Sequence, residues 1–221
     1  MSNNAQPDYY SHANAFFVAA LADDSRDSVS VLDVGCWNGT LGAQLIERFG
    51  AVVDGVEQDA RQAETAKTSG YRSVFQVDLD ELQADVIRDT YDFIFFGDVL
   101  EHLKQPDRIL TMLTRQLEPG GRVMISLPNV AFLACRISHL LGRWDYADYG
   151  ILDRTHLRFF TRKTMLKLVE DCGLHFEWTR GYVGLRNYPW FIRDTLRLLG
   201  RIWPTMFAIQ IVISARVKGQ V

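Results

Sequence analysis

Cysteine is scarce in this chain, and long apolar runs are absent from it. The three cysteines, Cys36, Cys135 and Cys172, are odd in number, and no two of them have C-x-x-C spacing. This pattern predicts neither a disulfide framework nor a metal site, and it fits the reducing cytoplasm. No run of 18 apolar residues occurs, and residues 1–8 contain no basic segment followed by an apolar core. We therefore expect neither a transmembrane helix nor a secretory signal.

Charge is unevenly distributed along the chain. At 221 residues, 48% of them hydrophobic, the chain is long enough for one well-buried domain and short for two. The net charge of −3 combines −11 over residues 1–121 with +8 over residues 122–221. The acidic first half lacks the basic patch of a nucleic-acid-binding protein. The basic second half favours a negatively charged partner or substrate, although a solvated mixed surface is the commoner explanation.

Residues 29–42 have the pattern of a strand, a tight turn and the start of a helix. The apolar residues of 29–34 are followed by Gly35 and Gly39, and then by apolar residues at helical spacing. Glycines let the backbone turn sharply and approach a ligand, and the next helix offers unpaired N–H groups. In an open α/β sheet such a turn lies at the carboxyl end of a strand, where cofactors bind. An ordinary turn without a ligand is the alternative.

Acidic residues stand at the ends of three successive predicted strands. Asp33 belongs to the first, Glu57 ends a strand over 51–57, and Asp78 follows a strand over 73–77. A carboxylate about 20 positions beyond a glycine-rich turn can accept hydrogen bonds from both hydroxyls of a ribose. We predict this role for Glu57, and a solvated strand terminus is the alternative.

Predicted strands and helices alternate through the first 128 residues. Two further strands are predicted over 91–96 and 122–127, and helices over 9–21, 41–49, 59–67 and 106–117. This alternation predicts a parallel, doubly wound α/β sheet with right-handed crossovers. An irregular aromatic stretch is expected at 142–158, helices over 131–141 and 161–172, and strands over 174–183 and 206–217.

Together these residues resemble a known family, the class I S-adenosylmethionine-dependent methyltransferases, over residues 29–183. The likeness lies in Val-Leu-Asp-Val-Gly-Cys-Trp-Asn-Gly at 31–39, Glu57, Asp78, Asp-Val-Leu-Glu-His-Leu at 98–103, and Leu-Glu-Pro-Gly-Gly at 117–121 before a strand and Leu-Pro-Asn at 127–129. The resemblance implies a seven-stranded, mostly parallel sheet with helices on both faces and an antiparallel last strand at 206–217. It implies a single methyltransferase domain over 1–221, with an N-terminal helical segment at 1–28, a cofactor-binding half at 29–130, a substrate-facing segment at 131–173 and a basic amphipathic insertion at 184–205.

The resemblance also implies S-adenosylmethionine as the cofactor and a set of residues that bind it. Asp33 and the backbone of Gly35, Cys36, Trp37 and Gly39 would hold the methionine part, Glu57 the ribose, and Asp78 with Leu79 the adenine. Gln58 would lie beside the ribose or adenine, and Gly97 and Asp98 would line the methionine side.

Trp37 departs from the family pattern, because it replaces the middle glycine of the loop. We expect it to exclude a backbone conformation open only to glycine, so that the homocysteine end is held somewhat differently. A nicotinamide-binding Rossmann domain is the rival interpretation, and its fingerprint is G-x-G-x-x-G. Gly35, Gly39 and Gly42 instead have G-x3-G-x2-G spacing, which argues against it. Gly42 is expected to allow close helix packing.

Two histidines are candidates for catalysis. Transfer of a sulfonium methyl is an in-line displacement, and a hydroxyl acceptor must also lose a proton, for which histidine is the usual base. His156 lies in the expected substrate-facing segment, and His102 follows the fourth strand. The alternatives are a packing role for His156 and a structural hydrogen bond to Glu101 for His102. Asp98 and Asp145 are weaker candidates.

The methyl acceptor is expected to be a small molecule or a lipid-linked glycan. The segment Thr-His-Leu-Arg-Phe-Phe-Thr at 155–161 and the insertion are similar to those of methyltransferases in polysaccharide and glycolipid pathways, which implies a sugar hydroxyl. A quinone or other aromatic metabolite is the alternative, suggested by the Phe and Tyr residues of 146–160. A non-catalytic S-adenosylmethionine-binding protein is the third interpretation. Nucleic acid is not expected, since no Asn/Asp-Pro-Pro-Tyr/Phe follows the fourth strand.

Residues 188–203 predict a basic amphipathic helix. Arg193, Arg197 and Arg201 recur every four residues on one helical face, beside apolar side chains. Such a helix is typical of proteins that rest on anionic lipid, so one interpretation is a cytoplasmic protein in peripheral contact with the inner face of the membrane. A helix that covers the sheet edge, with solvated arginines, is the commoner explanation.

Overall fold

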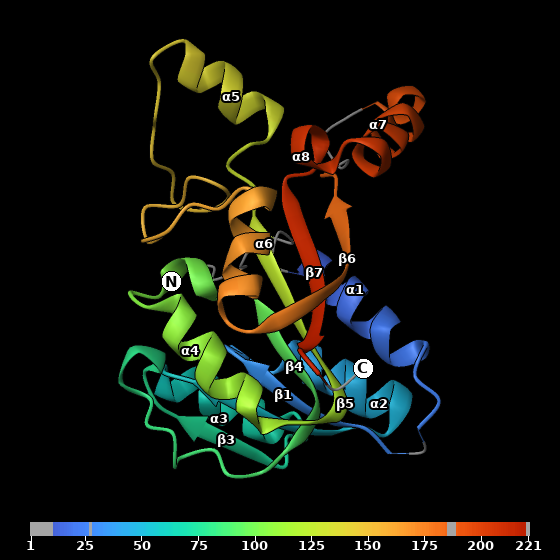
Figure 1. Cartoon of the computed structure of the whole chain (residues 1–221), viewed down its shortest axis with the longest axis vertical. Helices are drawn as coiled ribbons and strands as arrows, with labels where there is room; N and C mark the ends of the chain where they lie inside the picture. The colour runs from blue at the N-terminus through green and yellow to red at the C-terminus, as the bar shows by residue number, and fades with distance from the viewer. Residues whose placement is uncertain (1–10, 27, 185–188, 220–221) are drawn as a thin grey trace.

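A seven-stranded sheet forms the centre of the protein. The computed structural model describes residues 11–26, 28–184 and 189–219 (Figure 1). The strands are β1 (Ser30–Val34), β2 (Val52–Glu57), β3 (Ser73–Gln76), β4 (Tyr91–Gly97), β5 (Leu117–Pro128), β6 (Leu174–Tyr182) and β7 (Gln210–Val217). Their order is β3-β2-β1-β4-β5-β7-β6, and β7 is antiparallel to both of its neighbours. The predicted mostly parallel sheet with an antiparallel last strand is confirmed.

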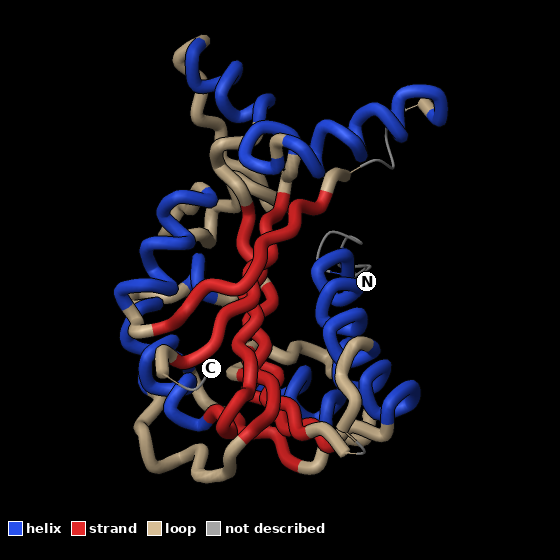
Figure 2. Tube along the Cα trace, turned by 45° about the vertical axis from the view of Figure 1, so that its right-hand side comes forward, coloured by secondary structure: helices blue, strands red, loops and turns tan. Residues whose placement is uncertain are grey.

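Helices cover both faces of this sheet (Figure 2). They are α1 (Ser11–Ala22), α2 (Thr40–Phe49), α3 (Ala60–Thr68), α4 (Pro106–Leu113), α5 (Leu133–Leu140), α6 (Arg162–Asp171), α7 (Trp190–Ile202) and α8 (Pro204–Phe207). Helices α1, α2 and α3 share one apolar core with the sheet, and α4 and α6 share the other. Helices α5, α7 and α8 lie beyond one end of the sheet (Figure 1). Within the described segments, no helix combines the length and apolarity needed to cross a bilayer.

Strand β4 joins the two cores. Phe93 and Phe95 face the core of α1 to α3, and Ile94 and Phe96 face the core of α4 and α6. Phe17 of α1 stacks on Phe95 with ring centroids 4.7 Å apart. An almost wholly apolar strand is therefore buried on both faces, as expected for the centre of a parallel sheet.

Two strand starts differ from the sequence prediction. Strand β5 begins at Leu117, although a turn was expected over 118–121, because Leu117 already pairs with Tyr91 before the register shifts. Strand β7 begins at Gln210 and not at residue 206. Pro204 instead opens the short helix α8, and proline is favoured at the first position of a helix. Residues 9 and 10 of the predicted first helix and residues 185–188 of the predicted insertion lie outside the described residues.

One buried amide connects the two groups of helices beyond the end of the sheet. Asn129 is 0% exposed and follows β5. Its side-chain nitrogen donates to the carbonyl oxygens of Thr205, at 3.0 Å, and Ala208, at 2.8 Å. Its side-chain oxygen accepts the N–H of Ala131, just before α5, at 3.1 Å. The segment that leads into α5 is thus tied to α8.

Candidate active site

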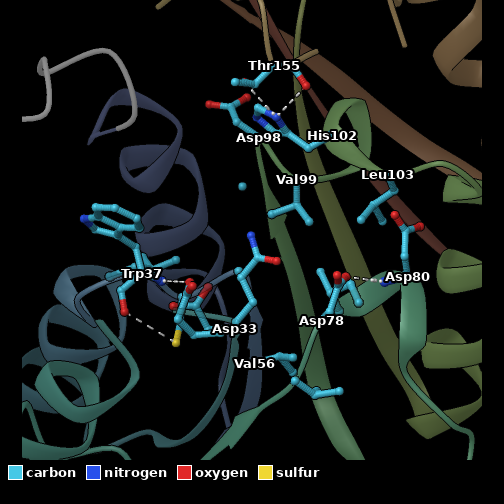
Figure 3. A pocket seen from close by; sticks show the side chains of 18 of the residues that line it. Asp33, Trp37, Val56, Asp78, Asp80, Asp98, Val99, His102, Leu103 and Thr155 are labelled. Atoms are coloured by element: carbon cyan, nitrogen blue, oxygen red, sulfur yellow. Dashed lines mark hydrogen bonds between the residues drawn. The ribbon is translucent and has the colours of Figure 1, made fainter. Parts of the chain in front are cut away.

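A cavity of about 860 Å³ lies at the carboxyl ends of β1, β2 and β4, within the usual size of a cofactor site (Figure 3). The predicted cofactor residues that line it are Asp33, Gly35, Cys36, Trp37, Glu57, Gln58, Asp78, Leu79, Gly97 and Asp98. Gly39 does not line the cavity. It precedes α2 with φ of 80°, and a Cβ there would lie 2.8 Å from the Ala66 Cα, so this glycine permits α2 and α3 to approach closely.

The carboxylate of Glu57 holds the glycine-rich turn. One of its oxygens accepts the N–H of Trp37 at 3.0 Å, and the other accepts the N–H of Asp59 at 2.8 Å. A carboxylate offers about four acceptor positions, so this arrangement leaves acceptor capacity on both oxygens. Trp37 itself has φ of 48°. The tryptophan thus adopts a left-handed backbone that is rare for residues other than glycine but not closed to them, at a cost of about 1–2 kcal/mol, while Glu57 accepts its N–H.

Asp33 is buried beside the hydroxyl of Tyr71. That hydroxyl donates to Asp33 at 2.6 Å and accepts the N–H of Gly42 at 3.0 Å. Burial raises the pKa of Asp33 to about 6; the Tyr71 hydrogen bond opposes this rise and the charge of Glu57 adds to it. A Cβ at Gly42 would lie 2.2 Å from the Tyr71 ring, which confirms that Gly42 permits close packing.

The variant Tyr71→Phe should lose about 1–3 kcal/mol of unfolding free energy, because it leaves the buried N–H of Gly42 without its acceptor. It also removes the donor to Asp33, so the pKa of Asp33 should rise further. Urea unfolding measures the first effect. Tyr149→Phe is the matched control, since that ring is 60% exposed. Equal stability of the two variants would contradict the proposed importance of this hydroxyl.

A second buried carboxylate, that of Asp98, lies at the end of β4. It accepts hydrogen bonds from the Ser126 hydroxyl, at 3.1 Å, and from the side-chain amide of Gln210. Burial raises the pKa of Asp98 to about 6, although both hydrogen bonds oppose the rise. Two buried carboxylates in one cavity suit a ligand that carries positive charge.

The adenine-side residues include one that the sequence reasoning missed. Asp78 is exposed and accepts the N–H of Asp80 at 2.9 Å, which starts a short 3-10 helix, Leu79–Glu81. Asp80 also lines the cavity and accepts the backbone N–H of Lys104 at 3.1 Å. Its position two residues beyond Asp78 was the available signal. Asn14 reaches the cavity from α1, which no local motif indicated.

The two candidate histidines lie together, but only one lines the cavity. Their ring centroids are 4.8 Å apart. His102 lines the cavity together with Thr155, whereas His156 is buried and does not line it. His102 Nδ1 lies 3.3 Å from Thr155 Oγ1, not beside Glu101 as the structural alternative supposed. Burial lowers the pKa of His102. Burial and the neighbouring His102 lower the pKa of His156. Both imidazoles are therefore neutral at pH 7.

Aromatic rings gather around His156. Phe159 lies 6.2 Å from the His156 ring centroid, 5.1 Å from that of Trp144 and 6.5 Å from that of Tyr146. Phe159 and three residues of the irregular segment predicted at 142–158 thus form an aromatic cluster. Asp145 is exposed and does not line the cavity.

The sheet order, the antiparallel β7 and the acid-rich cavity beside a glycine turn define a class I S-adenosylmethionine-dependent methyltransferase. The chain belongs to the family whose model is described as a methyltransferase domain, which matches residues 8–177. It is thus an enzyme with S-adenosylmethionine as its cofactor, and the buried carboxylates fit that cationic molecule.

Known proteins similar to the chain agree with this family. A ubiquinone biosynthesis O-methyltransferase of Xylella fastidiosa is 30% identical over 184 residues, which cover 80% of this chain and 71% of the relative. A solved S-adenosylmethionine-dependent methyltransferase from Mesorhizobium loti has a TM-score of 0.63 at 16% identity and covers 94% of this chain and 99% of its own. The magnesium protoporphyrin IX methyltransferase of Synechocystis, solved with bound SAH, has a TM-score of 0.65 at 18% identity and covers 93% and 82%.

Proposed function

We propose that the enzyme transfers a methyl group from S-adenosylmethionine to a hydroxyl on an aromatic, quinone-like acceptor. The structural observation that carries this proposal is neutral His102, which lines the same cavity as Asp33 and Glu57. The aromatic class is supported by the name of the 30% identical relative and by the ring cluster at Phe159. The sugar hydroxyl that the sequence favoured has no comparable support from these relatives.

The cofactor roles follow from the cavity lining. Glu57 keeps acceptor capacity for the two ribose hydroxyls, and Asp78 with Leu79 would contact the adenine. Asp33 and Asp98 would surround the positively charged methionine part, together with the turn from Gly35 to Trp37. Gln58 and Gly97 also line the cavity.

The affinity for S-adenosylmethionine should fall as the pH is lowered through about 6. Asp33 and Asp98 both have a pKa of about 6, so each loses the charge that attracts the cationic cofactor as the pH falls below that value. Two such groups predict a dissociation constant about 100-fold higher near pH 5 than near pH 7.5. Calorimetric titration at each pH measures it. The variant Asp33→Asn lacks one of the two groups, so it should bind S-adenosylmethionine more weakly at pH 7.5. Its dissociation constant should rise only about tenfold between pH 7.5 and pH 5, since one titrating group remains. Equal affinity of the unmodified enzyme at both pH values would contradict the role of these carboxylates.

The acceptor hydroxyl must lose its proton as the new oxygen–methyl bond forms. A phenolic hydroxyl has a pKa of about 10, so its deprotonation near neutral pH requires assistance. We assign this assistance to His102, whose Nδ1 is held beside Thr155 at 3.3 Å. Alignment of the hydroxyl oxygen behind the methyl carbon contributes the remaining acceleration.

The acceptor class can be tested with purified enzyme and two acceptor panels. One contains catechols and hydroxyquinols with short isoprenoid tails, and the other contains free, nucleotide-linked and lipid-linked sugars. Methyl transfer to an aromatic oxygen, located by mass spectrometry of the product, is the expected result. Transfer only to a sugar hydroxyl would overturn the proposed acceptor class, while the assignment of the cofactor would stand.

We also propose that the enzyme meets this acceptor at a membrane surface. Helices α5 and α7 follow the carboxyl ends of β5 and β6, which is the same edge of the sheet as the cavity. We call these two helices the platform. Large apolar side chains exposed on it or at its ends are Ile137, Leu140, Leu141, Trp190, Phe191, Leu198, Ile202 and Trp203.

Charge and a small groove support an anionic bilayer as the partner of the platform. Residues 133–143 contain two arginines and no acid, and residues 190–203 contain three arginines and one acid. Exposed aromatic and apolar side chains beside arginines are typical of helices that lie in the membrane interface. Between α5, α7 and α8 lies an apolar groove of about 180 Å³, lined by Leu133, Leu196 and Phe207 among others. A hydrocarbon tail would fit this lining.

The protein should sediment with liposomes that contain anionic lipid, and higher salt should release it, since salt screens the arginines. The double variant Trp190→Ala, Arg201→Glu should bind at least about tenfold more weakly, because each basic residue contributes about 1 kcal/mol near such a surface. Arg115→Glu is the charge-matched control, since it is exposed just before β5, at the opposite edge of the sheet. Failure of the unmodified protein to bind at low salt would overturn the membrane proposal.

A further inference from the structure

Glu101 is a buried carboxyl group without a hydrogen-bond partner. It is 1% exposed, and neither side-chain oxygen has a partner among the described residues. His156 Nε2 lies 3.9 Å from Glu101 Oε1, which is too long for a hydrogen bond. Buried polar atoms in native proteins are nearly always paired, so an unpaired buried carboxyl group indicates a ligand.

The hydrogen bonds of His156 determine which of its nitrogens is available. Its Nδ1 lies 3.2 Å from the carbonyl oxygen of Ile151. A carbonyl oxygen only accepts, so in the neutral ring Nδ1 carries the proton and Nε2 has a free lone pair. Nε2 is also the nitrogen that lies 3.9 Å from Glu101 Oε1.

His102 is held in the same way. Thr155 Oγ1 donates its own proton to Asp153 at 2.7 Å, so it can only accept from His102 Nδ1 at 3.3 Å. The carbonyl oxygen of Thr155, 3.4 Å from the same nitrogen, is a second acceptor. The proton of neutral His102 is therefore on Nδ1, and Nε2 is again free. Glu101, His102 and His156 thus each have an atom with an unshared electron pair. One such ligand atom from each residue lies within 4.8 Å of those of the other two.

We propose that Glu101, His102 and His156 bind a divalent transition-metal ion, for which Zn²⁺ is the best match. Two imidazole nitrogens and one carboxylate oxygen form a common ligand set of catalytic zinc sites, in which a fourth position stays open. The ligand atoms of a tetrahedral zinc ion, each about 2.0–2.2 Å from the metal, lie about 3.3–3.6 Å from one another. The 3.9 Å between Glu101 Oε1 and His156 Nε2 therefore needs only a small side-chain shift to reach that spacing. Both histidines also have the Nδ1–H anchor to an acceptor that is typical of metal-binding histidines.

The cysteine spacing predicts no metal site, because no two cysteines are close in the chain. The three ligands come instead from the segment after β4 and from the loop before α6, more than 50 residues apart in the chain. Only the fold brings them together.

The catalytic consequence rests on the proposed function, whereas the binding of the ion does not. His102 lines the cavity, so the open position of the ion would face the acceptor. A bound cation lowers the pKa of an oxygen that it contacts. In the transfer, the acceptor oxygen loses its proton to solvent and forms a bond to the methyl carbon as the sulfur–methyl bond breaks. His102 then assists deprotonation as a ligand of the ion.

The test is the metal content of the full chain. Protein stripped with a chelator and dialysed is titrated with Zn²⁺ against a chromogenic competitor, and Co²⁺ is added separately to record its visible absorption. We expect one ion per chain and a cobalt spectrum of low coordination number. Glu101→Gln and His156→Gln should each weaken binding at least about 100-fold, whereas His175→Gln, in an exposed position on β6, should not.

Glu101→Gln keeps the shape of the side chain, and a thermal melt verifies that it folds. Absence of stoichiometric binding to the unmodified protein, or equal binding by Glu101→Gln, would overturn the metal site. If methyl transfer to an aromatic hydroxyl proceeds in metal-free enzyme at its full rate, the proposed function stands and its metal-assisted step fails. If the ion binds but no aromatic acceptor is methylated, the metal site stands and the acceptor class fails.

Discussion

Glu57→Ala should weaken the binding of S-adenosylmethionine by at least about a hundredfold. In the proposed complex each oxygen of Glu57 accepts one ribose hydroxyl, in addition to the N–H of Trp37 or Asp59 that it already accepts. Hydrogen bonds to a charged group contribute about 1.5–3 kcal/mol each, and two of them correspond to a factor of about 100 or more in affinity. The variant also frees the N–H of Trp37, so the left-handed turn loses its anchor.

Calorimetry with S-adenosylmethionine measures this effect, and circular dichroism verifies that the variant is folded. Glu64→Ala is the matched control, because that carboxylate is 72% exposed on the neighbouring helix α3. The control should bind as the unmodified enzyme does. An unchanged dissociation constant for Glu57→Ala would show that the ribose lies elsewhere.

The second large effect is expected for His102→Gln, which should lower kcat by about 10²- to 10⁴-fold on the true acceptor. Glutamine can still donate a hydrogen bond to Thr155, but it neither takes up a proton nor binds a metal ion as an imidazole does. The affinity for S-adenosylmethionine should stay within about threefold, since the cofactor is held mainly by the acids at the strand ends. Single-turnover kinetics and calorimetry separate the two effects.

His175→Gln provides the control for an imidazole lost elsewhere, and it should keep full turnover. A further measurement uses acceptors with progressively more acidic hydroxyls. The loss of kcat in His102→Gln should become smaller as the acceptor hydroxyl becomes more acidic, because a more acidic hydroxyl needs less assistance to lose its proton. A deficit independent of acceptor acidity would contradict a role for His102 in deprotonation.

The sheet could be predicted from local patterns because each parallel strand is a short apolar run bounded by glycine or an acid. Glu57 and Asp78 follow such runs directly, so their convergence at one edge follows from the parallel order of β1, β2 and β3. Gly42 was likewise interpretable as a packing glycine. These features depend on neighbours in sequence or on the regular geometry of the sheet.

Features that depend on distant residues were not predictable in the same way. The left-handed backbone of Trp37 accompanies a hydrogen bond that its N–H donates to Glu57, 20 positions away. The start of β7 was misplaced because apolar residues at 206–209 suit a strand and the end of a short helix equally well. The burial of His156 and its approach to Glu101 follow from how the loop at 142–160 folds over the segment after β4, and no periodicity in the sequence describes that.

The amide of Asn129 has a consequence for any attempt to shorten the chain. Because its side-chain nitrogen donates to the carbonyl groups of Thr205 and Ala208, removal of residues 184–208 would remove both of these acceptors. Such a deletion would therefore disturb the start of α5 as well, although α5 lies outside the deleted stretch. Because the side-chain oxygen of Asn129 also accepts the N–H of Ala131, a shortened chain that keeps α5 should keep α8 as well.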